Sequence, residues 1–219
     1  MKVLLTGNTG GIGNCIEEQL KQSNIDLVGI TSKICDLSNP LNIPFFLRKY
    51  DQFDGMVHCA GVNPIRSYKD INQQEFTKVF NINTFSFIKL CQEINFSVGS
   101  NIIAIGSLWA TGTKEGRGQY SMTKHALLSA VKSLSLEMCH DNIKVNMISP
   151  GFVDTQMTRD NNSPETIDKI NKYIPLGLTK PTEIAKMCEY LLKNNQSITG
   201  QNIIIDSGYS IKNIKLNKN

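Results

Sequence analysis

A tyrosine and a lysine stand four residues apart in the segment YSMTK, at Tyr120 and Lys124. On a helix this spacing puts both side chains on one face, so their polar ends can meet. A phenol has a pKa of about 10, and a nearby ammonium group stabilises the phenolate and lowers that pKa. The pair could therefore transfer a proton at neutral pH. An ordinary exposed pair on a helix surface is the alternative.

A serine could complete this site. Ser107 directly follows the apolar run 101–106, which is typical of a buried strand. In an open α/β sheet the carboxyl ends of the strands line the ligand crevice. We therefore expect the Ser107 hydroxyl to face the same site as Tyr120.

A glycine-rich turn, TGNTGGIG, lies between the first predicted strand and the first predicted helix. Gly7 can form the tight turn, Gly11 lets the backbone approach a pyrophosphate, and Gly13 lets the helix pack closely on the strand. Thr9 and Ile12 fall inside the same turn and belong to the predicted cofactor site. The turn predicts dinucleotide binding at the helix N-terminus. A plain strand-to-helix turn is the alternative.

The pattern of apolar residues predicts the elements that position these groups. Short apolar runs without alternation predict strands at 2–6, 27–31, 55–59, 101–106, 144–148 and 202–206. Amphipathic stretches predict helices at 13–22, 73–93, 120–139 and 182–193. Strands covered on both faces are typical of parallel sheets, which need helical crossovers. We expect one α/β domain over residues 1–219, a doubly wound parallel sheet of the Rossmann type with helices on both faces.

The second crossover is predicted to be shortened. Only a few residues separate the strand at 27–31 from Asp36, too few for a helical crossover. Either the connection is a bare loop, or residues 33–36 form a stub of the next strand. The end of the same strand carries no acid for a ribose hydroxyl, whereas Ser32 and Lys33 could bind a 2′-phosphate. This favours NADP(H) over NAD(H), unless Lys33 is a solvated loop charge.

The overall composition excludes several classes of protein. The 219 residues are 40% hydrophobic and 19% charged, which is too apolar for a disordered chain. The net charge of +4 is small and scattered, which argues against nucleic acid as a partner. No apolar run approaches the roughly 18 residues of a membrane span, and no secretory signal is recognisable, so we expect a cytoplasmic protein without a membrane partner.

The six cysteines lack CxxC spacing, which predicts free thiols and no metal site. The polar tail at 210–219 is expected to be flexible.

Taken in order, these motifs resemble those of the short-chain dehydrogenase/reductase family over nearly the whole chain. The family's TGxxxGxG turn and its serine, tyrosine and lysine have direct counterparts, and the resemblance makes Ser107, Tyr120 and Lys124 the catalytic residues. It also implies that Asn83, on the long helix, is the fourth member of the catalytic set. The segments ITGQ and DSG near the C-terminus resemble the family's closing motifs.

The resemblance assigns further residues to the cofactor. Asp36 and Leu37 match the family's adenine-contacting positions, and HCAG at 58–61 matches the family's NNAG motif. VNMISPG at 145–151 resembles the family's VNxxxPG motif. The residues that these motifs and the segment after the last one assign to cofactor binding are Ala60, Gly61, Pro150, Gly151, Val153 and Thr155. His58 and Cys59 depart from the family's asparagines, and we expect His58 to be a structural histidine rather than a metal ligand.

The resemblance implies an NAD(P)-dependent oxidoreductase that transfers a hydride between the cofactor and a carbonyl or secondary alcohol. Tyr120 would donate the proton, Ser107 would bind the carbonyl oxygen, and Lys124 would hold the nicotinamide ribose. Asn83 would support a water that links Lys124 to solvent. The substrate is expected to be compact and polar, such as a 3-oxoacyl thioester or a sugar derivative. The alternative from another class is a catalytically silent, NAD(P)-binding regulatory or scaffold protein.

Two regions bear on the substrate. The loop before Tyr120 carries Lys114, Glu115 and Arg117, which could meet an anionic substrate or form a solvated face. Residues 151–178 fall where the family has its substrate lid. An apolar wall is expected there from Met157, Ile167, Ile170 and Ile174.

Assembly is implied by two predicted helices, 73–93 and 120–139, which family members commonly pair across a two-fold axis. They carry more apolar positions than one sheet face needs, including Leu127, Leu128, Val131, Leu134 and Leu136. A homodimer or homotetramer is the expectation, and burial of these side chains within one monomer is the alternative.

Overall fold

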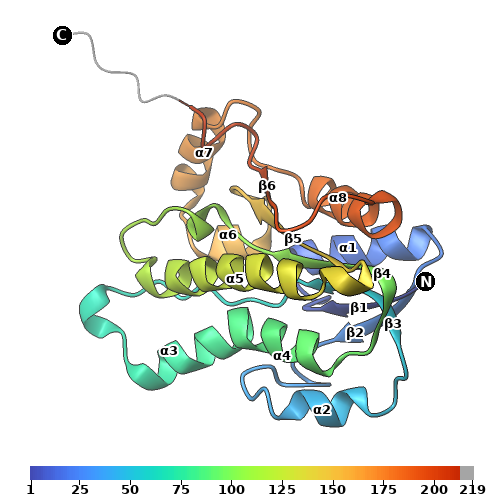
Figure 1. The fold of residues 1–219 in the computed structure, drawn as a ribbon. Helices are drawn as coiled ribbons and strands as arrows, with labels where there is room; N and C mark the ends of the chain where they lie inside the picture. The colour runs from blue at the N-terminus through green and yellow to red at the C-terminus, as the bar shows by residue number, and fades with distance from the viewer. Residues whose placement is uncertain (213–219) are drawn as a thin grey trace.

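Six parallel strands form one sheet in the computed structural model, which describes residues 1–212 of the chain (Figure 1). The strands are β1 (Lys2–Thr6), β2 (Asp26–Ile30), β3 (Phe53–His58), β4 (Phe96–Ile105), β5 (Lys144–Pro150) and β6 (Asn202–Ile205). Their order is β2-β1-β3-β4-β5-β6, and all neighbouring pairs are parallel. The chain adds β2 on one side of β1 and then crosses to the other side for β3. The carboxyl end of β1 is therefore the switch point at which such sheets bind ligands.

Helices cover both faces of the sheet, as the doubly wound prediction requires. The α-helices are α1 (Gly11–Gln22), α2 (Asn42–Leu47), α3 (Gln73–Phe80), α4 (Ser86–Glu93), α5 (Gly118–Glu137), α6 (Gln156–Asp160), α7 (Pro164–Tyr173) and α8 (Pro181–Asn194). Short 3₁₀ turns occupy Tyr68–Asp70, Leu108–Ala110 and Cys139–Asp141. Among residues 1–212, no helix combines the length and the apolar character needed to cross a bilayer.

Each face of the sheet has its own apolar core. On one face, α1 and α8 pack together and bury Ile16 and Leu191 against the sheet. On the other face, α2, α4 and α5 contribute Phe46, Phe87 and Leu127 to a second cluster. Two cores explain why the strand sequences are apolar without alternation, because both faces of each central strand are buried.

The second crossover differs from both expectations. Residues 33–36 form no strand, and the connection is not a bare loop, because it contains the six-residue helix α2. This helix buries Ile43, Phe46 and Leu47, which share one face at helical spacing. Six residues are too few to stand out as an amphipathic period in the sequence, which is why α2 was not predicted.

The predicted helix at 73–93 is interrupted. A π-helical turn, Asn81–Phe85, separates α3 from α4, so that three segments follow one another without a loop. This turn buries Asn83 and Thr84, two polar side chains that would be unusual on the buried face of a regular helix. Single π turns occur frequently at functional sites.

The predicted tail at 210–219 falls mainly outside the described residues. Its described part is a turn in which the Ser210 N–H donates a hydrogen bond of 2.7 Å to Asp206 Oδ2.

Candidate active site

A cavity of about 410 Å³ opens at the carboxyl ends of β1, β2, β3 and β4. The predicted cofactor residues that line it are Gly7, Thr9, Gly11, Ile12, Gly13, Ser32, Asp36, Leu37, Ala60, Gly61, Tyr120, Lys124 and Thr155. Residues from the first and the second half of the chain thus surround one space, as the motif order predicted. Pro150, Gly151 and Val153 line an adjoining pocket instead.

The glycine-rich turn makes close contacts that only glycine allows. Gly7 has a φ of +71°, and a Cβ on it would lie 2.7 Å from the backbone that follows β3. A Cβ on Gly13 would lie 2.1 Å from the Gly7 carbonyl oxygen. The N-terminus of α1 has no side-chain cap, so its first N–H groups remain available. Because Gly11, Ile12 and Gly13 line the cavity, these groups fit the pyrophosphate of a dinucleotide.

At the other end of the cavity, the structure separates Ser32 from Lys33. Ser32 lines the cavity, whereas Lys33 is exposed and lines neither this cavity nor the adjoining pocket. The Cys35 N–H donates a hydrogen bond of 2.9 Å to the Thr31 carbonyl oxygen. Residues 31–35 therefore form a turn in which Lys33 is exposed. The lining of the two spaces gives no support to its assignment to the cofactor site, which stays a prediction with a solvated loop charge as the alternative. Asp36 accepts hydrogen bonds from both the N–H and the hydroxyl of Ser38, which hold its pKa below the usual range.

Tyr120 lies on the first turn of α5, where the cavity meets the adjoining pocket. Its side chain is buried, with 9% of its surface exposed. Burial raises the pKa of its phenol to about 12, while the Ser107 hydroxyl and the Arg117 guanidinium act in the opposite direction. The expected lowering of this pKa by Lys124 is not found, although the Lys124 Nζ lies 5.7 Å from the centre of the Tyr120 ring. The phenol is consequently protonated at neutral pH.

Lys124 is buried to 3% exposure on the same helix face as Tyr120. Its Nζ donates a hydrogen bond of 2.8 Å to the carbonyl oxygen of Ile105 at the end of β4. Burial lowers the pKa of Lys124 to about 8. A buried ammonium group that lines the cavity is available to the hydroxyl groups of a bound ligand.

Asn83 joins two segments beside Lys124. Its Oδ1 accepts a hydrogen bond of 2.8 Å from the Val62 N–H. Its Nδ2 donates two hydrogen bonds, one of 2.9 Å to the Val62 carbonyl oxygen and one of 3.0 Å to Thr123 Oγ1. The amide group therefore fixes the backbone after Gly61 against α5. Asn83 lies next to the cavity rather than in its wall.

A buried link through His58 was missed by sequence reasoning. Thr6 Oγ1 accepts hydrogen bonds from the N–H groups of Cys59 and Ala60, at 3.1 and 3.0 Å, and contacts His58 Nδ1 at 3.1 Å. Since two donors occupy its lone pairs, the Thr6 hydroxyl donates its own proton to Nδ1. His58 is then neutral with its proton on Nε2, and burial lowers its pKa to about 3. In the sequence, this link could have been inferred from Thr6 at the end of β1 and His58 at the end of β3, the neighbouring strand.

A pocket of about 120 Å³ adjoins the cavity at Tyr120. Ser107, the predicted third group, lines it, and its hydroxyl accepts 3.2 Å from the Trp109 N–H. Tyr120, Ser107 and Lys124 are thus brought together as the sequence predicted, on two adjacent spaces. Residues that line the pocket but escaped the sequence analysis include Asn63, Trp109, Asn161 and Asn162.

The segment 151–178 supplies one wall of this pocket, though not the apolar wall that was expected. Met157 lines the pocket, whereas Ile167, Ile170 and Ile174 do not. Ile174 is instead buried at 3% exposure away from it. Short helices α6 and α7 set this arrangement, because the α6 turn brings Met157 and the following asparagines inward.

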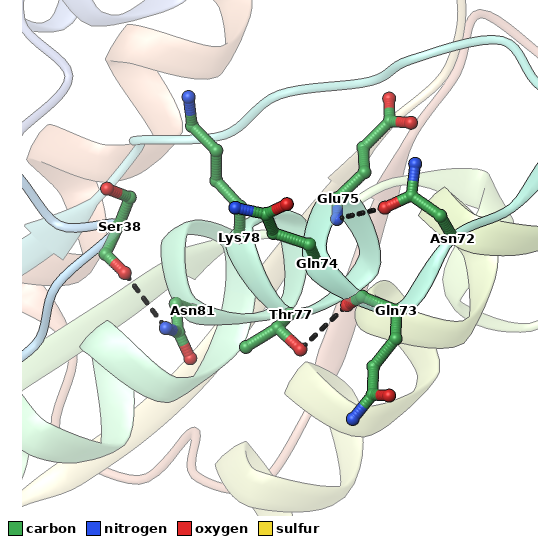
Figure 2. A pocket seen from close by; sticks show the side chains of 8 residues that line it. All are labelled: Ser38, Asn72, Gln73, Gln74, Glu75, Thr77, Lys78 and Asn81. Atoms are coloured by element: carbon green, nitrogen blue, oxygen red, sulfur yellow. Dashed lines mark hydrogen bonds between the residues drawn. The ribbon is translucent and has the colours of Figure 1, made fainter.

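A second, more open hollow of about 790 Å³ lies along α3 and contains no predicted site residue (Figure 2). Its walls are polar, and Asn81 Nδ2 donates 2.8 Å to the Ser38 carbonyl across it. Asn72 caps α3 by accepting 2.8 Å from the Glu75 N–H. Asn72, Thr77 and Asn81 form hydrogen bonds with backbone groups, and no predicted site residue lies here, so we place the chemistry at the cavity beside Tyr120.

Known proteins resemble this chain in sequence and in fold. The family model described as enoyl-(acyl carrier protein) reductase matches residues 43–210. The 3-oxoacyl-[acyl-carrier-protein] reductase FabG of Buchnera aphidicola is 30% identical over 236 residues, covering 94% of this chain and 95% of that protein. A short chain dehydrogenase family protein from Francisella tularensis has a TM-score of 0.87 at 28% identity, covering 96% of this chain and 99% of that one. This chain belongs to the short-chain dehydrogenase/reductase family.

As a short-chain dehydrogenase/reductase, the protein is an NAD(P)-dependent oxidoreductase that acts on a small molecule. The family and the fold predicted from the motifs are confirmed. Another relative, carbonyl reductase family member 4 of Xenopus laevis, is 26% identical over 94% of this chain and 96% of that protein. The alternative of a silent scaffold gains no support from these relatives.

Proposed function

We propose that the protein reduces a compact carbonyl compound with NAD(P)H and that Tyr120 is the proton donor. The observation that carries the proposal is the position of Tyr120, which lines both the cofactor cavity and the adjoining pocket. A group at this junction can reach the oxygen of a substrate whose carbonyl carbon lies against the nicotinamide end of the cavity. Its raised pKa keeps the phenol protonated at neutral pH, as proton donation requires.

The residues have distinct parts in the reaction. The reduced nicotinamide supplies the hydride when it is bound. The proton leaves Tyr120 Oη for the carbonyl oxygen as the C=O bond opens, which leaves a phenolate on the protein. Ser107 hydrogen-bonds to the same oxygen and fixes its position. The Lys124 ammonium binds ribose hydroxyls of the cofactor.

Asn83 has a positioning role in this proposal. Because its amide forms hydrogen bonds with Val62 and Thr123, the side chain holds Gly61 and Val62 in the cavity wall next to Lys124.

The direct test replaces Tyr120 by phenylalanine and follows NADPH oxidation with a 3-oxoacyl thioester. Loss of the proton donor is expected to lower kcat roughly 10²- to 10⁴-fold. Cofactor affinity, measured by NADPH fluorescence, should change little. Tyr190→Phe is the matched control, because Tyr190 is half-exposed on α8, remote from both spaces. Near-normal turnover by Tyr120→Phe would refute the assignment.

For the cofactor, we propose a preference for NADP(H). Its support is the absence of an acid at the end of β2, where the hydroxyl side chains of Thr31 and Ser32 line the cavity. Fluorescence titration should give a lower Kd for NADPH than for NADH, and Ser32→Asp should reverse the order by repelling the 2′-phosphate. Tighter binding of NADH by the wild type would count against it.

For the substrate, the relatives' names favour a 3-oxoacyl group on a thioester, and a small sugar ketone is the other class with the right size and polarity. The pocket volume of about 120 Å³ supports a compact reacting end. We assign residues 151–178 as the cover over this pocket, because α6 and the asparagines after it form one of its walls. Domain limits of 1–219 remain part of the same proposal.

We also propose a homodimer or homotetramer through the helices at 73–93 and 118–137. Fewer apolar side chains are free for a subunit contact than the sequence indicated, because Leu127, Leu128 and Val131 are buried within the monomer. Phe85 and Leu136 are exposed by 41% and 75% and remain available for contact. Light scattering should give a mass of at least two chains, and a monomer at micromolar concentration would exclude this assembly.

A further inference from the structure

Arg117 is a loop cation that the structure brings into the small pocket beside Tyr120. It precedes α5, three residues before Tyr120, and its half-buried side chain lines the same 120 Å³ pocket as Ser107 and Tyr120. Its Nη1 donates 2.8 Å to Asn63 Oδ1 and contacts the Asn63 carbonyl at 3.5 Å. The guanidinium is therefore oriented by a neighbour instead of moving freely in solvent.

The charge of this guanidinium is not neutralised by the chain. Among residues 1–212, none of the carboxylates forms an ion pair with Arg117. Burial lowers the pKa of Arg117, and within the described part of the chain the Tyr120 phenol is the one ionisable group that acts on that pKa. Both hydrogen bonds use Nη1, which leaves the Nε and Nη2 donors for other partners. A half-buried cation with free donors is stabilised by an anionic ligand.

The remaining walls suit a small ligand with one anionic end. Trp109 and Phe152 supply apolar surface, while Asn161 and Asn162 add amide groups. Lys114 also lines the pocket but is exposed, so solvent screens its charge. Of the two cations that line this pocket, Arg117 is the one that is half-buried.

We propose that Arg117 binds a carboxylate on the substrate, so that the compound reduced at Tyr120 is a small oxo acid with its carboxylate close to the reacting carbonyl. This inference rests on the proposed function, because Tyr120 marks where the carbonyl lies. It keeps the carbonyl reduction but favours a charged oxo acid over the thioester and the sugar ketone, since neither of these neutral compounds has a charge at this position. A planar carboxylate also matches the two-pronged geometry of a guanidinium.

The first experiment compares three substrates that share one 3-oxobutanoyl group: acetoacetate, its methyl ester and its N-acetylcysteamine thioester. For the wild type, kcat/KM with the acid should exceed that with either neutral compound. Arg117→Gln should lower the ratio of acid to ester roughly ten- to a hundredfold, as expected for a lost charged hydrogen bond. Any effect of Arg117 on the Tyr120 phenol acts on all three substrates and cancels in this ratio.

Lys114→Gln is the matched control, because it removes an exposed cation from the same pocket. Its acid-to-ester ratio should stay within roughly threefold of the wild type, as for a screened surface charge. An equal loss in both variants would refute a specific site at Arg117. So would a wild type that prefers the neutral compounds and is unaffected by Arg117→Gln, although carbonyl reduction itself would then stand.

The second experiment measures binding without turnover. Trp109 is the only tryptophan of the chain and lines the pocket, so its fluorescence reports occupancy directly. Acetoacetate is titrated in the presence of NADP⁺, which cannot reduce it. The wild type should bind acetoacetate at least tenfold more tightly than Arg117→Gln does. If this difference appears while no carbonyl compound is turned over, the carboxylate site stands and the proposed function fails. Equal affinities would overturn the carboxylate site.

Discussion

The Lys124 ammonium donates a hydrogen bond of 2.8 Å to the carbonyl oxygen of Ile105, the last residue of β4. This contact joins the helix that carries Tyr120 to the strand that leads to Ser107. It places a charged group in a buried position without a carboxylate partner among the described residues. Burial accordingly lowers the pKa of Lys124 to about 8, and this value has consequences for both activity and stability.

The pH dependence of carbonyl reduction should follow Lys124. With the pKa of Tyr120 raised to about 12, the proton donor stays protonated and neutral across the neutral pH range. With the pKa of Lys124 at about 8, the ammonium is lost above that pH. We expect kcat/KM for reduction to be constant between roughly pH 6 and 7.5 and to fall above about 8. A pH–rate profile tests this, and Lys124→Arg should remove the alkaline limb. A limb that persists in Lys124→Arg would assign it to another group.

Lys124→Met should stabilise the protein while removing its activity. The pKa falls from 10.5 to about 8 on folding, so the folded state disfavours the charged side chain by about 3 kcal/mol at neutral pH. Loss of the hydrogen bond to Ile105 reduces the net gain to roughly 1–3 kcal/mol, or several degrees in Tm.

The advantage of Lys124→Met should shrink as the pH rises from about 8 to 10.5. In that window the unfolded wild type binds more protons at Lys124 than the folded wild type does, so wild-type stability increases with pH. Calorimetry at pH 7 and pH 9.5 measures both effects. A lower Tm for Lys124→Met at pH 7 would contradict the prediction.

His58 should make the protein sensitive to acid. Its pKa is lowered from 6.5 to about 3 on folding, so the unfolded state takes up a proton below pH 6.5 that the folded state refuses. The contribution is complete above pH 6.5 and is lost progressively as the pH falls toward 3. Between pH 7 and 5, the wild type should lose about 2 kcal/mol more than His58→Asn in urea unfolding. Identical losses in the two proteins would show that His58 is already protonated or solvated.

Gly13→Ala should disrupt the cofactor turn. The added Cβ would meet the Gly7 carbonyl oxygen at 2.1 Å, a backbone contact that no side-chain rotation relieves. We expect a loss of roughly 1–3 kcal/mol in stability and at least a tenfold rise in the Kd for NADPH. Gly118→Ala is the control, because a Cβ there meets nothing within 4 Å. Unchanged NADPH affinity in Gly13→Ala would mean that the turn does not hold the cofactor.

The sequence was sufficient for the sheet and for the meeting of the catalytic groups. Buried parallel strands are apolar throughout, so they are visible as runs, and the helical spacing of Tyr120 and Lys124 survives any shift in helix boundaries. Ser107 follows from its place at a strand end. These features depend on local periodicity and on the polarity of a parallel sheet, both of which a single sequence contains.

Other features depend on contacts between distant segments. The short helix α2 is stabilised by packing Phe46 into the core, not by a long amphipathic pattern. The link from Thr6 to His58 joins residues that only the sheet brings together. The pKa of Tyr120 follows from how deeply the phenol is buried, which overrides the expected influence of a lysine one turn away. Arg117 faces a pocket because Asn63 holds it there.

The π-helical turn at Asn81–Phe85 joins α3 to α4, and its length decides which way Asn83 faces. Each residue of an α-helix rotates the side chains by about 100°, so the widened turn sets the angle at which Asn83 faces Val62 and Thr123. Deleting one residue here would leave every reactive group in the chain yet turn Asn83 toward a different neighbour. The number of residues between α3 and α4 therefore matters for the site, and deleting one of them should be more damaging than most substitutions.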